Sequence, residues 1–293
     1  MKSDLKRHGK RIRVFPMILL ILILLIALLF IDSNFRIVTT EYELYYSNLP
    51  DSFDGFRIVV LADVHDTEFG RGNNRLISRI HDAKPDIIVI SGDLLNAYGN
   101  SRPEEKQLER IETLIVSLVP IAPVYFVSGN HDANIVFGGS EALFEVLEEG
   151  GVRILRNDYD RIEFGGEAVI IAGVNYHGKK SLEKIESELA DRIYDTEGDA
   201  FVILLRHRND NMHFLSEHAF DLILSGHAHG GVIRLPFTDG LIGPTREWFP
   251  THTSGVYTMD NTNMLVSRGL GNPSSVPRFL NNPHIAVAVL RSA

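Results

Sequence analysis

The chain has 293 residues, of which 44% are hydrophobic and 23% are charged, so a disordered or fibrous protein is excluded. It contains no cysteine, which excludes disulfides, iron–sulfur clusters, thiolate metal sites and a cysteine nucleophile. Its formal net charge of −9 argues against the basic stripe that a nucleic-acid binder needs, so we expect no nucleic-acid partner. An acidic protein of this kind is suited to binding cations.

The N-terminal end combines a basic tip with a long apolar segment. Residues 1–13 contain six lysines and arginines, and residues 14–31 (VFPMILLILILLIALLFI) carry no charge. Eighteen helical residues span roughly 27 Å, just enough for a bilayer core of about 30 Å. The competing interpretation is a cleaved signal peptide, whose apolar region is usually shorter and ends in a small-residue site that ALLFIDSNF lacks. We therefore predict a transmembrane signal anchor over residues 14–31 that is not cleaved.

The orientation of this anchor follows from the distribution of basic residues. After the basic tip and the apolar segment, Arg36 is the only lysine or arginine in the next twenty-five residues. The positive-inside rule places the basic tip in the cytoplasm. We therefore expect a single-pass protein of the cell membrane whose catalytic body lies outside the cytoplasm.

The body begins with a juxtamembrane stretch, residues 32–55, that includes a first strand around 36–46. From Phe56 onward, continuous apolar runs alternate with helical patterns, and such runs are typical of strands buried on both faces. The predicted strands are 56–62, 86–91, 123–128, 168–174, 200–205 and 221–225, and the predicted helices are 72–83, 103–118, 140–149, 181–192 and 210–217. After residue 230 the pattern predicts hairpins with strands at VIRL (232–235), VYTM (256–259) and MLVSR (264–268), and a last strand at 285–290. These features favour one α/β domain over residues 56–293, with sheets sandwiched between helix layers.

Five polar clusters follow the predicted strands. They are Asp63-Val64-His65, Gly92-Asp93, Gly129-Asn130-His131-Asp132, Arg206-His207 and Gly226-His227-Ala228-His229-Gly230-Gly231. Each cluster alone is typical of a surface turn or a buried histidine, but the carboxyl ends of strands in such folds face the ligand crevice. Three carboxylates and five imidazoles at one sheet edge need a strong positive charge, which two divalent cations provide. Oxygen and imidazole ligands without sulfur suit Mn, Fe, Zn or Co.

The ordered set D-x-H, GD, GNHD, H and GHxHGG, from about Phe56 to Gly231, resembles the calcineurin-like metallophosphoesterases. The resemblance implies a four-layer α/β/β/α sandwich. The GHAHGG element, the SRGLGN stretch (267–272) and the N-terminal anchor are most similar to the membrane-associated bacterial branch. That branch includes phosphodiesterases resembling the enzymes that hydrolyse UDP-2,3-diacylglucosamine.

The resemblance also implies roles for individual residues. It assigns one metal ion to Asp63, His65, Asp93 and His229. It assigns the second to Asp93, Asn130, His207 and His227, with the Asp93 carboxylate bridging. His131 would protonate the leaving oxygen and Asp132 would orient His131. The sequence departs from the family beside these ligands, at RHRND (206–210), Ala228 and Val232, which concerns substrate contacts more than metal binding.

Several other residues have two interpretations. Arg268 and Arg278 flank SRGLGNPSSVP and are candidates for binding a substrate phosphate, although surface salt bridges are the simpler interpretation. His177 follows a predicted strand and is a further candidate for a substrate contact. Trp248 and Phe249 either pack inside the fold or form an apolar wall beside the membrane.

The resulting hypothesis is a membrane-anchored phosphoesterase with two divalent ions per chain, manganese being favoured over iron and zinc. We expect a phosphodiesterase or pyrophosphatase that hydrolyses a lipid-linked or envelope phosphate ester, UDP-2,3-diacylglucosamine-type substrates included, by attack of a metal-bridging hydroxide. The alternatives are a phosphomonoesterase or protein phosphatase with the same metals, and a non-catalytic metal-binding scaffold. We expect the protein to be a monomer with an amphiphilic substrate.

Overall fold

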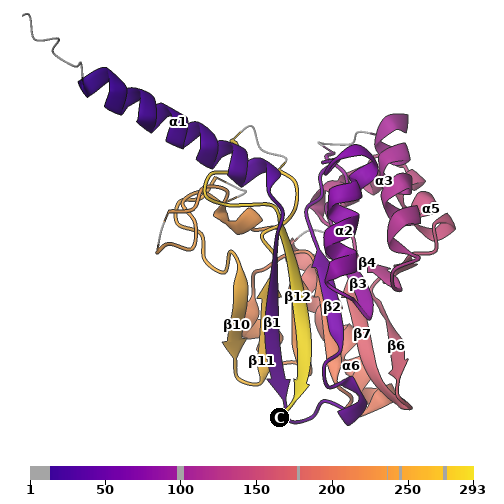
Figure 1. Ribbon diagram of the computed structural model, residues 1–293. Helices are drawn as coiled ribbons and strands as arrows, with labels where there is room; N and C mark the ends of the chain where they lie inside the picture. Colours follow the sequence, from indigo (N-terminus) through magenta and orange to yellow (C-terminus); the bar gives the residue numbers. More distant parts are fainter. Residues whose placement is uncertain (1–13, 98–101, 177–178, 236, 244–245, 273–275) are drawn as a thin grey trace, which may run out of the picture.

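A computed structural model describes residues 14–97, 102–176, 179–235, 237–243, 246–272 and 276–293 (Figure 1). The basic tip and His177 lie outside the described residues. The first element, helix α1 (Val14–Phe35), projects from the body and ends four residues beyond the predicted anchor. Among the described helices, α1 is the one long and apolar enough to cross a membrane, a property that signal sequences share.

The body contains two sheets, each of six strands over the described residues. The first sheet has the order β1 (Val38–Tyr46), β12 (His284–Ser292), β2 (Arg57–Leu61), β3 (Ile87–Ile90), β4 (Val124–Phe126) and β5 (Arg153–Ile154). The second has the order β10 (Gly255–Met259), β11 (Thr262–Val266), β9 (Leu222–Ser225), β8 (Val202–Arg206), β7 (Glu167–Val174) and β6 (Asp158–Phe164). All six apolar runs between Phe56 and Ser225 therefore form strands, as predicted.

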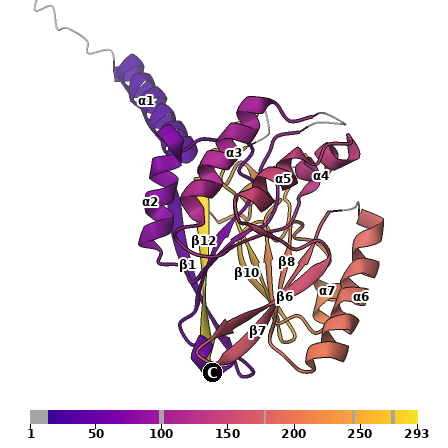
Figure 2. The same ribbon diagram turned by 90° about the vertical axis from the view of Figure 1, so that its right-hand side faces the viewer.

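Helices cover the outer face of each sheet (Figure 2). Those on the first sheet are α2 (Asn74–Asp82), α3 (Glu105–Leu118), α4 (Asn130–Phe137) and α5 (Ala142–Glu149). Those on the second sheet are α6 (Lys179–Glu197) and α7 (Met212–Ser216). Short 3₁₀ turns occur at Asp51–Phe53, Arg71–Asn73 and His229–Gly231. This layer order confirms the predicted α/β/β/α sandwich.

Burial of the strands on both faces explains why their sequences are continuously apolar. In β2, Ile58 and Val60 point into the core between the two sheets, whereas Val59 and Leu61 pack under the helices of the first sheet. Because successive side chains of a strand alternate between its faces, a strand covered on both sides needs an apolar residue at every position. Burial on both faces is therefore confirmed for this strand.

Three details differ from the sequence-based expectations. The VIRL segment forms no strand of its own, because Ile233 makes only an isolated bridge to Phe279. Strands β5 and β6 were not predicted, and β6 has an exposed, charged edge sequence (DYDRIEF) without a continuous apolar run. Helix α4 was also not predicted, since it begins inside the Gly129-Asn130-His131-Asp132 cluster and is only eight residues long.

The fold gathers the polar clusters at one end of both sheets. Strands β2, β3 and β4 run parallel to one another, as do β7, β8 and β9. Their carboxyl ends lie at the end of the body from which α1 leaves (Figure 1). The predicted ligands follow these strand ends directly, so the topology alone places them on one rim.

Candidate metal centre

The first cluster of predicted ligands contains Asp63, His65 and His229, all buried. The His65 Nε2 atom lies 3.3 Å from the His229 Nε2 atom, and the latter lies 3.4 Å from Asp63 Oδ1. The His227 backbone amide donates to Asp63 Oδ2 at 3.0 Å. The carboxylate of a residue after β2 is therefore fixed by the backbone that follows β9, which ties the two sheets together at the cluster.

The second cluster contains Asp93, His207 and His227. The His207 Nε2 atom lies 3.2 Å from Asp93 Oδ2 and 3.1 Å from His227 Nδ1. Asn130 Oδ1 lies 3.2 Å from the same Nε2 atom. Asp93 Oδ2 is also 3.7 Å from His65 Nε2, so the Asp93 carboxylate lies between the two clusters.

Close backbone packing holds Asp93 in this position. Gly92 has φ +86°, and a Cβ atom there would lie 2.4 Å from the Gly129 nitrogen. A Cβ atom on Gly129 would lie 2.2 Å from Asp93 Oδ1. The glycines of the GD and GNHD motifs are therefore required by this approach, because no other residue lacks the clashing atom.

The backbone is left-handed at five of the predicted ligands. The φ values are 52° at Asp63, 47° at His65, 54° at Asp93, 67° at His227 and 48° at His229. Non-glycine residues adopt this conformation at a cost of about 1–3 kcal/mol each, and such strain concentrates at functional sites. This backbone conformation turns each side chain away from the direction of the preceding strand and toward the common rim.

Asp132 connects the GNHD motif to the GD motif. Its buried carboxylate accepts hydrogen bonds from the backbone amides of Asp93 at 2.6 Å, Gly129 at 3.0 Å and Leu95 at 3.2 Å. The His131 amide in turn donates to Asp93 Oδ1 at 2.8 Å. These contacts fix the start of α4 against Asp93, so Asp132 holds His131 through the backbone of this helix.

The charges of the site are strongly perturbed by burial. Burial raises the pKa of Asp63 to about 7, and burial together with the Asp93 charge raises the pKa of Asp132 to about 7. Burial also disfavours ionisation of Asp93, but His207 and His65 together hold the pKa of Asp93 below its usual range. The pKa of His207 rises to about 9, because Asp93 and Asp63 outweigh its burial.

The remaining imidazoles of the two clusters are kept neutral. Burial lowers the pKa of His65 to about 3, and it lowers the pKa of His227 and His229 well below the usual value. Neutral imidazoles beside an ionised carboxylate offer free lone pairs, which is the state that binds metal ions. Two such clusters with the Asp93 carboxylate between them fit a pair of divalent ions.

His131 lies close enough to these atoms to have two possible roles. It forms a third potential ligand group with His65 and Asp93, and its ring centroid lies 4.9 Å from that of His65. Unlike the members of the first two clusters, His131 is only half-buried. The geometry therefore allows either a ligand or a group that faces a bound substrate.

The two arginines predicted to bind substrate occupy different environments. Arg278 is buried, and its Nη2 atom donates to the carbonyls of Gly271 at 2.7 Å and Arg268 at 2.8 Å and lies 3.5 Å from His229 Nδ1. Arg268 is half-buried, and burial lowers the pKa of its guanidinium. Arg278 thus supports the back of His229, and a substrate contact of either arginine stays a prediction.

Three residues that contact the clusters were not identified from the sequence. Asn281 Nδ2 donates to the His229 carbonyl at 2.7 Å and to the Val232 carbonyl at 3.1 Å. The Ser91 carbonyl lies 2.8 Å from His207 Nδ1 and fixes that ring. Arg208 Nη1 lies 3.1 Å from His227 Nε2. The unusual RHRND sequence was the only feature that could have identified Arg208. Asn281 and Ser91 are ordinary loop residues that no sequence pattern distinguishes.

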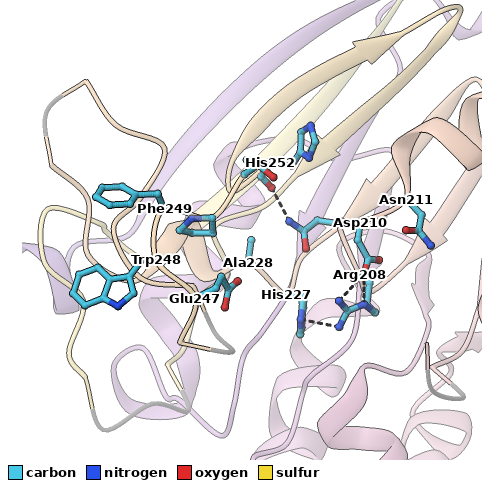
Figure 3. A pocket seen from close by; sticks show the side chains of 12 residues that line it. Arg208, Asp210, Asn211, His227, Ala228, Glu247, Trp248, Phe249 and His252 are labelled. Atoms are coloured by element: carbon cyan, nitrogen blue, oxygen red, sulfur yellow. Dashed lines mark hydrogen bonds and ion pairs between the residues drawn. The ribbon is translucent and has the colours of Figure 1, made fainter. Parts of the chain in front are cut away.

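A groove of about 490 Å³ lies beside the second cluster (Figure 3). Arg208 and His227 line one part of it, and Trp248 and Phe249 line another. The Arg208 guanidinium is held by Asp210 Oδ2, which accepts from Nε at 2.8 Å and from Nη2 at 2.5 Å. A cation fixed next to a metal cluster is suited to binding an anionic group such as a phosphate.

Comparison with known proteins agrees with this geometry. Residues 56–231 match the family model for calcineurin-like phosphoesterases. The chain is 31% identical to an uncharacterized metallophosphoesterase of Bacillus subtilis, YkuE, over 87% of this chain and 86% of that protein. The protein therefore belongs to the calcineurin-like metallophosphoesterase family, and it is a metal-dependent phosphoester hydrolase.

Two further relatives have informative names. A zebrafish (Danio rerio) transmembrane protein with a metallophosphoesterase domain is 27% identical over 86% of this chain and 57% of that protein. The Escherichia coli phosphodiesterase YaeI is 24% identical over 76% of this chain and 77% of that protein. Among solved structures, TT1561 of Thermus thermophilus has a TM-score of 0.46 at 13% identity and covers 75% of this chain and 90% of that one.

Proposed function

We propose that the protein is a membrane-anchored phosphodiesterase or pyrophosphatase with two metal ions per chain. The observation that carries this proposal is the position of Asp93, whose Oδ2 atom lies 3.2 Å from His207 Nε2 and 3.7 Å from His65 Nε2. A carboxylate in this position can bridge two ions about 3.5–4 Å apart, which is the separation of two-metal phosphoesterases.

The two clusters define the proposed ligand sets. Asp63, His65, Asp93 and His229 would hold one ion. Asp93, Asn130, His207 and His227 would hold the other. The donors are oxygen and nitrogen atoms without sulfur, for which manganese is our first choice and iron and zinc the alternatives.

Divalent ions, when bound, activate water and screen the charge of the phosphate oxygens. The protein's own contribution begins with His131, which we expect to protonate the leaving oxygen, an effect typically worth about 10²–10⁴ in rate. His131 is half-buried at the start of α4, where Asp132 and Asp93 fix the backbone. Arg208, held by Asp210, would bind a charged oxygen of the substrate in the groove.

The groove and the anchor support a substrate with both a phosphate and an apolar part. The groove extends from His227 and Arg208 to Trp248 and Phe249. The name of the Escherichia coli relative supports phosphodiester hydrolysis. We therefore favour a lipid-linked or envelope phosphodiester or pyrophosphate as the substrate. Hydrolysis of UDP-2,3-diacylglucosamine-type substrates remains a prediction.

The cellular arrangement is part of the same proposal. Helix α1 would anchor a single-pass protein, with residues 1–13 in the cytoplasm and the body outside it. Protease added to intact cells should then digest the body. Complete protection in intact cells, with digestion after lysis, would reverse this orientation.

A comparison of two chromogenic esters tests the reaction class. Full-length protein loaded with Mn²⁺ should hydrolyse bis-p-nitrophenyl phosphate faster than p-nitrophenyl phosphate, and Asp93→Ala should abolish both activities. Faster hydrolysis of the monoester would favour the phosphomonoesterase alternative. Metal-loaded protein that is inactive on both esters and on nucleotide-sugar lipids would favour the non-catalytic scaffold.

A further inference from the structure

The described part of the loop between the metal centre and β10 exposes four large apolar side chains, and we call its described residues, 233–235, 237–243 and 246–254, the aromatic loop. Leu235, Phe237, Trp248 and Phe249 have exposed fractions of 43%, 106%, 67% and 66%. Trp248 and Phe249 lie side by side, with ring centroids 6.4 Å apart. In Figure 3 they lie on the far side of the groove from Arg208. Several large apolar side chains exposed on one loop, two of them side by side, indicate an interaction surface.

The C-terminal end of α1 is bound to the body through the segment 278–282. Ser33 Oγ accepts a hydrogen bond from the Leu280 amide at 2.8 Å. Asn34 Nδ2 donates to the Arg278 carbonyl at 2.9 Å, and Asn282 Nδ2 donates to the Asp32 carbonyl at 2.7 Å. These contacts fix where α1 leaves the body.

The aromatic loop starts from the same segment. The Arg234 amide donates to the Phe279 carbonyl at 3.0 Å, and the Phe279 amide donates to the Val232 carbonyl at 3.3 Å. The root of the aromatic loop and the end of α1 are thus bound to neighbouring residues of the same segment, 278–282. In Figure 1 the chain leading into β10 lies on the side of the body toward which α1 projects.

We propose that the aromatic loop rests on the surface of the phospholipid bilayer that α1 crosses, with Trp248 at the level of the head groups. The side chains of α1 from Phe15 to Leu28 are all exposed, so a bilayer that surrounds this part of α1 ends next to the root of the loop. Tryptophan favours the membrane–water interface, and phenylalanine and leucine side chains favour the apolar side of it. Continuity with α1 is the reason for choosing a bilayer over a second copy of the chain.

This arrangement places the groove at the membrane surface. The groove contains Trp248 and Phe249 at one part and Arg208 and His227 at another. A lipid whose phosphate reaches Arg208 could therefore keep its acyl chains in the bilayer. The inference deepens the proposed function, since it depends on α1 as a membrane anchor, but it does not depend on bound metal or on catalysis.

The chain contains one tryptophan, so intrinsic fluorescence reports on Trp248 alone. The full-length protein is incorporated into nanodiscs of phosphatidylcholine brominated on the upper part of the acyl chains, and incorporation is verified by co-elution. We expect the Trp248 emission to shift to shorter wavelength relative to detergent, to be mostly quenched by the bromolipid, and to be protected from aqueous iodide.

A matched control places the only tryptophan elsewhere. In the double variant Trp248→Phe, Tyr194→Trp, the reporter stands on α6, at a position that is 57% exposed and distant from α1. This reporter should be quenched by iodide and not by the bromolipid. Phe237→Asp in the natural background should reduce bromolipid quenching of Trp248, since it adds a charge to the docking surface.

The outcomes separate the possible occupants of the surface. If iodide quenches Trp248 in the incorporated protein and bromolipid does not, Trp248 faces water and the proposal is overturned. If neither quencher reaches Trp248, it is covered by protein, as in a dimer, and the proposal is also overturned. Because the measurement needs no substrate, a positive result from a protein inactive on every ester would fault the proposed reaction and not the docking surface.

Discussion

The two sheets contribute different chemistry to the metal centre. Segments after strands of the first sheet contribute the proposed oxygen ligands and one proposed imidazole ligand: Asp63, Asp93, Asn130 and His65. Segments after strands of the second sheet contribute only proposed imidazole ligands: His207, His227 and His229. The first and second clusters each combine residues from both sheets, so each proposed ion would be held by both sheets. The centre therefore depends on the apolar core between the sheets, where Val60 and Leu205 among others are buried.

The largest effect is expected from Asp93→Ala, on the first sheet. Because this carboxylate lies between both clusters, its removal should abolish binding of both ions and lower the rate about 10³-fold or more, which corresponds to several kcal/mol of lost transition-state stabilisation. Elemental analysis of metal-loaded protein and the rate with bis-p-nitrophenyl phosphate measure the two effects.

Two control variants show whether the shared position of Asp93 matters. His227→Ala, on the second sheet, removes a ligand from one cluster only and should leave one ion bound. Asp221→Ala removes a carboxylate that accepts from the Val202 amide at 2.7 Å, at the opposite end of β9 from His227, and should leave both ions bound. Equal metal loss in the Asp93 and His227 variants would contradict the shared position proposed for Asp93.

His131→Ala is expected to have a smaller effect on rate and none on metal content. If His131 donates a proton, the hydrolysis rate of the variant should fall about 10²–10⁴-fold. The fall should be smaller for a substrate with a good leaving group such as p-nitrophenolate than for one with an alkoxide leaving group. Comparing p-nitrophenyl and alkyl phosphodiesters in parallel with elemental analysis tests this role. Metal loss equal to that of Asp93→Ala would make His131 a ligand, through its group with His65 and Asp93.

Neighbouring asparagines allow a test of the support behind His229. Asn281 donates to the His229 carbonyl, whereas Asn282 donates to the Asp32 carbonyl at the end of α1. Asn281→Ala should weaken metal binding about 10–100-fold, because partners of a ligand orient it. Asn282→Ala should leave metal affinity unchanged. Titration with Mn²⁺ measures both, and equal effects would argue that the whole 278–282 segment acts as one unit.

The smallest effect concerns the pH dependence of metal binding. Although burial disfavours its charged form, His207 has a pKa of about 9 because Asp93 and Asp63 stabilise that form. At neutral pH the metal-free protein therefore holds a proton on His207, and a metal ion must displace it. Between pH 7 and about 9 the affinity should thus rise about tenfold per unit, and below pH 7, where the proposed ligand Asp63 is also protonated, it should fall more steeply. Calorimetry in two buffers of different ionisation enthalpy detects the released proton, and a pH-independent affinity would contradict this account.

Strand positions and the polar clusters could be predicted from the sequence, because both depend on local patterns. Strands covered on both faces are continuously apolar, and the motif residues follow them directly. Five helices were located correctly for the same reason, since their apolar spacing is regular. The family motifs then identified the residues that the structure brings together at the rim.

What the sequence did not reveal depends on contacts between distant segments. The left-handed backbone at Asp63 and Asp93 is stabilised by packing against other loops, which no local pattern encodes. Asn281 supports His229 across 52 positions of the chain. The VIRL segment was predicted to be a strand, but its Ile233 makes only an isolated bridge to Phe279. Arg278 was predicted either to bind a substrate phosphate or to form a surface salt bridge, and tertiary contacts bury it behind His229.

The central claim is that residues of both sheets hold a pair of neighbouring ions around Asp93. The most direct measurement is anomalous X-ray diffraction from crystals of the Mn²⁺-loaded protein, recorded on both sides of the manganese edge. We predict two anomalous peaks per chain, one beside His65 and His229 and the other beside His207 and His227, with Asp93 contacting both. A single peak, or peaks remote from Asp93, would contradict the account.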